Sequence, residues 1–121
     1  MLEQNVDDEE EQPGKCWFRT ATGHLFASVE DIVYIKSDGN YSVVVTTTDQ
    51  VMVMESLLAI ERRLKSGLFL RVDRKNIINK KLVYKINSQN NTCLFLAANG
   101  SKYELRLSKR GVETLLEVMA T

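Results

Sequence analysis

Short runs of β-branched and aromatic residues recur along most of the chain, and turn-forming residues separate them. Runs of four to eight such residues are typical of strands, and the turn signals between them indicate short connections. Eight runs of this kind are present, at residues 16–20, 32–36, 41–47, 51–54, 69–72, 82–87, 92–97 and 102–107. This pattern predicts a mainly antiparallel β domain.

One pair of runs carries the signature of a hairpin. Asn99 and Gly100 lie between the last two runs, and an Asn-Gly pair favours a type I′ turn, in which both central residues have positive φ. Residues 102–107 alternate between charged and apolar side chains, as in a strand with one buried face. Residues 92–107 are therefore predicted to form a hairpin with a type I′ turn.

Two segments carry apolar residues at helical spacing instead. Apolar side chains recur at i, i+3 and i+7 in residues 56–65, and at i, i+3, i+4 and i+7 in residues 109–120. Ser56 and Ser108 precede these segments, where a serine hydroxyl can cap free N–H groups, and Gly67 follows the first segment as a stop signal. Two short helices are predicted.

The chain divides by charge into an acidic leader and a basic domain. The 16 Lys and Arg balance the 16 Asp and Glu over the whole chain, but residues 1–12 hold six acids and no base. Residues 1–15 are too polar to bury enough apolar area to offset the entropy of ordering them, so they are expected to be a disordered leader or linker. Residues 16–121 are expected to form one domain, and residues 13–121 carry 16 bases against ten acids, a net charge of about +6.

Neither a membrane segment nor an active site is evident. No apolar run reaches the 18 or so residues that span a bilayer, and the acidic N-terminus is unlike a signal peptide, so a cytoplasmic location is expected. Cys16, Cys93 and His24 form no metal-binding motif, and no glycine-rich phosphate loop is present. A protein that is not an enzyme and has no cofactor or metal is predicted; a hydrolase using a cysteine and His24 is a remote alternative.

Positive charge is concentrated in one stretch of the sequence. Residues 62–85 contain nine bases and a single acid, Asp73, a density that attracts polyanions. Asn76 and Asn79 lie among these bases, and their amides could hydrogen-bond to base edges as well as to phosphate. The alternative is a solvated surface whose bases are spread over several faces.

A second basic feature opens the C-terminal helix. Lys109 and Arg110 fall in its first turn, where the helix dipole disfavours cations by about 0.3 to 1 kcal/mol each. A phosphate bound to the free N–H groups of this turn would reverse that penalty, and Gly111 would allow a close approach. Alternatively, the two side chains simply extend into water.

These residues form a recognisable pattern. Residues 69–79, FLRVDRKNIIN, resemble the signature F-x-R-V-H-R-S-Y-I-V-N of LytTR-type DNA-binding domains. Four further motifs occur in the family's order: DIVYI at 31–35, NYSV at 40–43, SL at 56–57 and LRLSKR at 105–110. The resemblance extends over about residues 16–119.

The resemblance implies a fold, a partner and a set of contacts. Members have an elongated arrangement of small antiparallel β-sheets with short helices, and are usually output domains of bacterial two-component response regulators, working with a receiver domain and a sensor kinase. They bind promoter double-stranded DNA as homodimers on paired repeats, through loops and strand ends in successive major grooves. The implied DNA-binding residues are Asn40, Tyr41, Ser42, Arg71, Arg74, Lys75, Asn76, Asn79, Lys80, Ser108, Lys109 and Arg110.

The chain departs from the family signature at three positions. Asp73, Lys75 and Asn76 stand where the family commonly has His, Ser and Tyr. An Asp cannot donate to a phosphate, so Asp73 is expected either to pair with Arg71 or Lys75, or to accept from a cytosine amino group.

The function predicted from the sequence is sequence-specific DNA binding as the output domain of a bacterial transcriptional regulator. Bases would fix the register on the phosphates, while Asn40, Arg74 and Asn76 are the candidates for reading base edges. The alternative function is a protein-interaction module that binds an acidic partner through its basic face.

Overall fold

The computed structural model describes residues 14–120, which form ten strands, two helices and two 3-10 turns. In chain order these are β1 (Lys15–Arg19), β2 (His24–Ser28), η1 (Val29–Asp31), β3 (Ile32–Asp38), β4 (Tyr41–Thr46), β5 (Gln50–Val53), α2 (Leu57–Arg63), β6 (Phe69–Arg71), β7 (Asn76–Asn79), η2 (Lys80–Leu82), β8 (Val83–Asn87), β9 (Thr92–Leu96), β10 (Lys102–Arg106) and α3 (Lys109–Met119). The mainly β fold class is confirmed.

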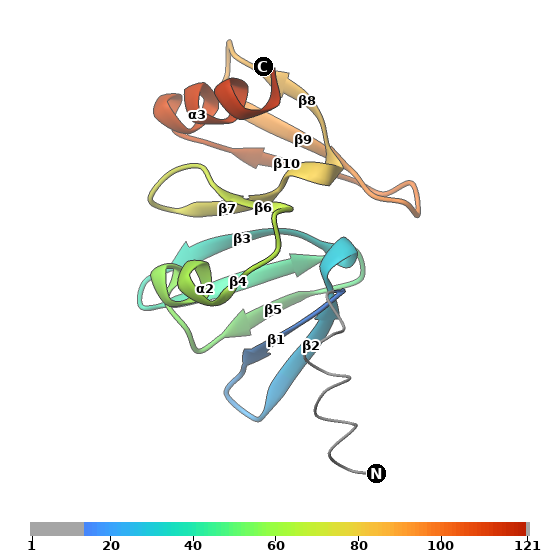
Figure 1. The fold of residues 1–121 in the computed structure, drawn as a ribbon, viewed down its shortest axis with the longest axis vertical. Helices are drawn as coiled ribbons and strands as arrows, with labels where there is room; N and C mark the ends of the chain where they lie inside the picture. The colour runs from blue at the N-terminus through green and yellow to red at the C-terminus, as the bar shows by residue number, and fades with distance from the viewer. Residues whose placement is uncertain (1–13, 121) are drawn as a thin grey trace.

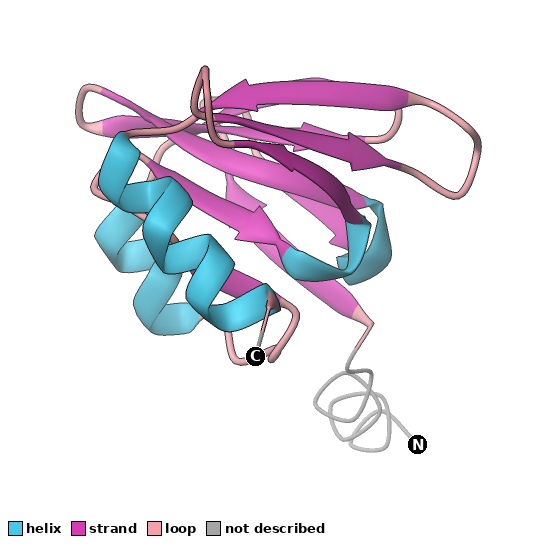
Figure 2. Ribbon diagram, turned by 90° about the horizontal axis from the view of Figure 1, so that it is seen from above, coloured by secondary structure: helices cyan, strands magenta, loops and turns pink. Residues whose placement is uncertain are grey.

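The strands form three antiparallel sheets that follow one another along the long axis of the molecule (Figure 1). A five-stranded sheet of order β5-β4-β3-β7-β6 occupies the middle. The three-stranded sheet β10-β9-β8, with α3, lies at one end, and the hairpin β1-β2 lies at the other. Figure 2 shows α2 and α3 on the same side of the sheets. The predicted elongated arrangement of small antiparallel sheets with two short helices is therefore confirmed. Neither helix of residues 14–120 is long and apolar enough to cross a membrane.

The central sheet is buried on both faces, because a separate hydrophobic cluster lies against each face. Neighbouring residues of its strands point to opposite clusters: Ile78 joins the cluster under the three-stranded sheet, and Ile77 joins the cluster under α2 and the hairpin. A strand buried on both faces reads as a continuous apolar run, which explains the sequence of residues 32–35. The register shifts between Ile32 and Tyr34, and this bulge turns Val33 and Tyr34 toward the same cluster.

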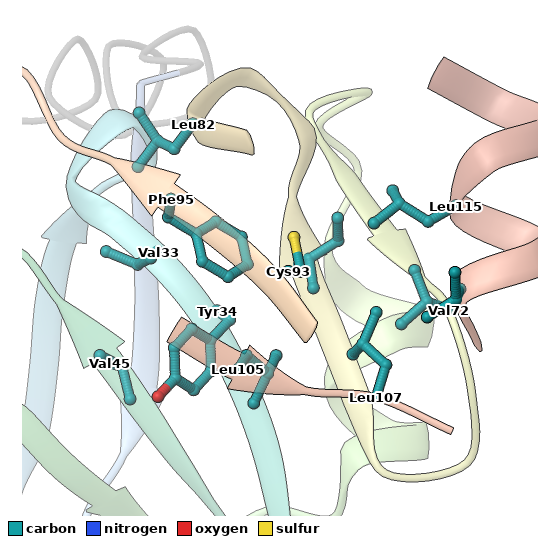
Figure 3. Packing of buried hydrophobic residues seen from close by; sticks show 12 residues of the cluster. Val33, Tyr34, Val45, Val72, Leu82, Cys93, Phe95, Leu105, Leu107 and Leu115 are labelled. Carbon is teal, nitrogen blue, oxygen red and sulfur yellow. The ribbon is translucent and has the colours of Figure 1, made fainter. Parts of the chain in front are cut away.

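The hydrophobic cluster that contains Ile78 fills the space between the central sheet, the three-stranded sheet and α3, and we call it the upper cluster (Figure 3). The rings of Tyr34 and Phe95 lie 5.6 Å apart between the two sheets, within the range of a favourable aromatic pair. Leu115 of α3 is fully buried and anchors the helix over this cluster. Cys93 is also fully buried, and desolvation raises the pKa of its thiol to about 12.

The hydrophobic cluster that contains Ile77, which we call the lower cluster, attaches the β1-β2 hairpin and α2 to the central sheet. Phe18 of β1 and Ile60 of α2 are fully buried in it. Polar contacts reinforce the attachment: Arg63 of α2 pairs with Glu55 at 2.8 Å, and its guanidinium carbon lies 4.3 Å from the centre of the Trp17 ring. This second core explains why the short α2 is stable, since packing and not propensity supplies most helical stability.

The local signals are confirmed at both helix starts and corrected at one turn. The hydroxyls of Ser56 and Ser108 accept hydrogen bonds from Ala59 N and Gly111 N, as N-caps. The predicted type I′ turn is wrong, because Gly100 has a φ of +89° while Asn99 is not among the residues with positive φ. Instead, Gly100 N donates to Ala97 O, and Gly100 itself is the one residue of the turn with a positive φ. This is a common three-residue hairpin loop.

Candidate nucleic-acid interface

Three segments that are distant in sequence meet along one edge of the molecule, at the left in Figure 1. They are the β3-β4 turn at residues 39–40, the β6-β7 loop at residues 72–75, and the junction of β10 and α3. Two grooves of about 520 Å³ each connect them, the first reaching Gly39 and the second reaching Ser108. Arg74 and Lys75 line both grooves, so the β6-β7 loop is the centre of this edge.

The guanidinium group of Arg71 binds the backbone of the β6-β7 loop. Its Nε donates to the backbone oxygen of Asp73 at 3.1 Å, and its Nη2 donates to the backbone oxygen of Arg74 at 3.0 Å. Its Nη1 pairs with Glu61 of α2 at 2.9 Å. With all three nitrogen groups engaged, the Arg71 side chain holds the loop and is not a free cation.

Asp73 turns its carboxylate toward the start of α3. Oδ1 accepts hydrogen bonds from Lys75 N at 2.9 Å and from Asn76 Nδ2 at 3.1 Å. Oδ2 accepts from the backbone N–H and the hydroxyl of Ser108, both at 3.1 Å. The predicted pairing of Asp73 with the Arg71 or Lys75 side chain is therefore wrong, since the carboxylate is bound by these other donors.

The same contact brings a carboxylate to the start of α3. Oδ2 of Asp73 binds the N–H and the hydroxyl of Ser108, the N-cap of the helix, where the predicted phosphate would also lie close. A carboxylate at a helix N-terminus offsets the unfavourable placement of Lys109 and Arg110 in the first turn. These two bases are exposed, so they remain available for contacts beyond the groove.

Five exposed bases lie in the second groove or beside it at the start of α3, and we call them the basic face: Arg74, Lys75, Arg106, Lys109 and Arg110. Four of them line the groove, and Lys109 lies between Ser108 and Arg110. The ion pairs found within residues 14–120 include none of the five. Arg106 was missed from the sequence, although its place on the charged side of the last strand, two residues before the Ser108 cap, is the signal that identifies it.

Three of the predicted contact residues are buried polar residues of the central sheet. Ser42 is fully buried and its hydroxyl donates to the backbone oxygen of Glu55 at 2.8 Å. Asn79 is fully buried and donates to the backbone oxygen of Ile32 at 2.9 Å. Asn76 is 6% exposed and donates to Asp73. Each of these three side chains makes a hydrogen bond inside the protein.

Two further parts of the prediction change with the fold. Asn79 and Lys80 lie at the end of β7 away from the loop, about 10 Å along the strand from Asn76. The basic run at residues 62–85 does not form one surface, because three of its members pair with acids of other elements. Exposed Asn40 and Tyr41, at the β3-β4 turn, stay beside the first groove.

Neither a cluster of metal-binding residues nor an ionised Cys93 is found in the part of the chain that the structure describes. Residues 14–120 contain no group of three His, Cys, Asp or Glu residues that could hold a metal ion. His24 stacks beside Trp17 and Phe26, with ring centres 5.7 and 6.3 Å away. Burial keeps Cys93 protonated by raising its pKa to about 12, whereas a nucleophile must be a thiolate.

Comparison with known families gives one match over most of the chain. The LytTr DNA-binding domain family matches residues 23–120. The matched region contains all three segments of the edge described above and every base of the basic face.

Two curated relatives come from Paraburkholderia xenovorans (strain LB400). The heme-containing CO-sensing transcriptional regulator RcoM 1 is 24% identical over 95 residues, which are 78% of this chain and 36% of the relative. The heme-containing CO-sensing transcriptional regulator RcoM 2 is 34% identical over 55 residues, which are 46% of this chain and 21% of the relative. The chain thus corresponds to about a third or less of the length of these relatives.

A solved structure has the same fold. A chain from Bacillus cereus, described as the LytTr DNA-binding domain of a response regulator, superposes with a TM-score of 0.66 at 17% sequence identity. The superposition covers 89% of this chain and 98% of the other.

Proposed function

This chain belongs to the LytTr DNA-binding domain family, and from that membership we propose that it binds double-stranded DNA sequence-specifically as the output domain of a bacterial transcriptional regulator. The observation that carries the proposal is the basic face, where five bases from the β6-β7 loop and the β10-α3 junction lie in or beside one groove, and none of them takes part in an ion pair within residues 14–120. Bases gathered in this way release counterions from several neighbouring phosphates.

The exposed side chains divide into two roles. Lys75, Lys109 and Arg110 suit phosphate contacts, because their side chains are exposed and take part in no ion pair within residues 14–120. Arg74 is the proposed base reader, because it lines both grooves and a guanidinium can bind the O6 and N7 atoms of guanine together. Asn40, exposed at the β3-β4 turn, is the second proposed reader.

The buried members of the original set have a supporting role in this proposal. Ser42, Asn76 and Asn79 hold strands and the β6-β7 loop in place, and Arg71 holds the loop backbone. Loops that contact DNA bases require such support, since loops alone are mobile.

We extend the proposal to the assembly in which the domain works. Paired copies of the chain bind repeated half-sites, and a receiver domain or another sensory domain of the same regulator controls the pairing. The curated relatives, both transcriptional regulators of greater length, support a role as one part of a larger regulator. Promoter binding places the protein in the cytoplasm.

Selection of bound duplexes from a random DNA pool tests the proposal directly. Repeated selection with the chain should enrich one sequence, and the affinity for that sequence should fall steeply with salt. A pool without enrichment, together with an affinity that does not respond to salt, would contradict DNA binding. Parallel titration of a chain lacking residues 1–12 separates DNA binding from capture of an acidic protein partner, which would compete with the acidic leader.

A further inference from the structure

We propose that Asp73 is a positioning residue that fixes the distance between two DNA-binding segments, the β6-β7 loop and the start of α3. The inference rests on the proposed DNA-binding function. It assigns to Asp73 a role through its hydrogen bonds inside the protein, and none in direct contact with DNA.

The two oxygens of the Asp73 carboxylate serve different segments. Oδ1 binds Lys75 N and the Asn76 amide within its own loop. Oδ2 binds the backbone N–H and the hydroxyl of Ser108, 35 residues later in the chain. Within residues 14–120, these two contacts of Oδ2 are the hydrogen bonds found between the β6-β7 hairpin and the start of α3. One carboxylate therefore sets the spacing of the two segments.

Gly111 makes this contact sterically possible. A Cβ atom at position 111 would lie 2.7 Å from Oδ2 of Asp73 and 3.2 Å from Oγ of Ser108. The first distance is shorter than real Cβ contacts allow, so any side chain at position 111 would displace the carboxylate. Glycine is otherwise an unfavourable residue inside a helix, and the close approach of Asp73 accounts for its presence in the first turn of α3.

The same contact accounts for the charges of the helix start. The first turn of α3 contains no acidic residue but begins with Lys109 and Arg110, which the helix dipole disfavours. The Asp73 carboxylate supplies the missing negative charge from another segment. Gly111 and the two bases are each unfavourable in the first turn of a helix, and the Asp73 carboxylate accounts for them.

Loss of the contact should affect sequence discrimination more than general affinity. Arg74 and Lys75 stand on one side of the contact, and Arg106 and Arg110 on the other, around the same groove. All of these bases persist when Asp73 is replaced, so the release of counterions continues. Their relative positions are no longer fixed, so contacts that require a defined spacing weaken.

The test uses Asp73→Asn and Gly111→Ala in the full chain, with Asp31→Asn as the matched control. Asp31 is exposed, and its side chain takes part in none of the hydrogen bonds found within residues 14–120. Asp73→Asn keeps the side-chain size but presents an NH₂ group to N–H donors that need an acceptor. The dissociation constants for the selected duplex and for random DNA are measured at several salt concentrations.

Both variants should lower the ratio of specific to random affinity by about tenfold, the effect of one mismatched base pair. The salt slope should stay at the wild-type value, and the random affinity should hold or rise, because a carboxylate leaves or moves within a basic face. The double variant should lose no more than either single variant, since both remove one contact. Asp31→Asn should match the wild type.

Several results would overturn the inference. An unchanged ratio in folded Asp73→Asn, an equal loss on both DNAs, or additive losses in the double variant would each do so. If Gly111→Ala does not fold, Ser108→Ala replaces it, since it removes the same hydroxyl donor. If the wild-type chain selects no sequence, the proposed function fails, and residual dipolar couplings of free wild-type and Asp73→Asn protein still decide whether Asp73 fixes α3 relative to the β6-β7 hairpin.

Discussion

The side-chain amide of Asn79 donates a hydrogen bond of 2.9 Å to the backbone oxygen of Ile32, 47 residues earlier in the chain. The same nitrogen lies 3.3 Å from the backbone oxygen of Val29, and Oδ1 accepts from Lys81 N at 2.9 Å. The Asn79 side chain is fully buried, so it joins the end of β7 to the start of β3 without contact with solvent. A residue at this position supports the sheet that carries the β6-β7 loop.

Replacement of Asn79 by Ala should lower the free energy of unfolding by about 1 to 3 kcal/mol, because buried carbonyl groups lose their donor. Urea denaturation measures the loss. The folded fraction should keep its affinity for DNA once the data are corrected for unfolded chain. Lys80→Ala, at the neighbouring partly exposed position, should change stability by less than about 0.5 kcal/mol. A loss of DNA affinity without a loss of stability would show that Asn79 contacts DNA after all.

Replacement of Arg74 by Ala should weaken binding to the selected duplex more than binding to random DNA, by about 1 to 3 kcal/mol of discrimination. Lys85→Ala is the control, since this exposed base lies on β8 of the other sheet and lines neither groove. Fluorescence anisotropy with both duplexes gives the two affinities. Equal losses on the two DNAs would restrict Arg74 to phosphate contacts.

The logarithm of the affinity for duplex DNA should fall with the logarithm of the salt concentration at a slope of roughly −4.5, if the domain engages about five phosphates. Lys109→Gln should reduce the size of this slope by about 0.9, because it removes one phosphate contact. The same titration on Lys85→Gln should reproduce the wild-type slope. A wild-type slope near zero would remove the electrostatic basis of the proposal.

Cys93 should resist alkylation in the folded protein at pH 8, because burial raises the pKa of its thiol to about 12 and leaves about one molecule in 10⁴ as thiolate. A Cys16→Ser variant isolates this thiol, and mass spectrometry after iodoacetamide treatment measures the reaction with and without urea. The raised pKa also predicts that the contribution of Cys93 to folding stability is constant below the ordinary thiol pKa of 9.0 and is lost as the pH rises toward 12. Rapid modification without urea would indicate that the upper cluster opens readily.

The strands that could be predicted from the sequence are those with a long run or a clear alternation, such as residues 41–46 and residues 102–106. The two strands that were missed lack such a signal. β7 reads Asn-Ile-Ile-Asn, and its asparagines disfavour a strand until their buried partners are known. β2 reads His-Leu-Phe-Ala-Ser, with Phe26 exposed and no alternation to mark it. In both cases tertiary contacts, and not local propensity, determine the structure.

The segments that form the candidate interface could be predicted from the sequence, but the individual side chains that are exposed there could not. The family signature identified the β6-β7 loop and the start of α3, because short motifs retain their order in the sequence. Sequence could not separate exposed Arg74 from Arg71, which is engaged by Glu61 of α2. Nor could it show that Asn76 donates to Asp73 inside the protein. Whether a polar side chain faces DNA depends on partners tens of residues away.

The central sheet has a consequence for how the molecule comes apart. β3, β4 and β7 each place neighbouring residues in both hydrophobic clusters, as Ile77 and Ile78 illustrate. Loss of packing in either cluster exposes one face of the central sheet, and the other cluster packs against the opposite face of the same strands. Although the three sheets look separable in Figure 1, we therefore expect them to unfold as one cooperative unit, with the most protected amides of both clusters exchanging at the same free energy of opening.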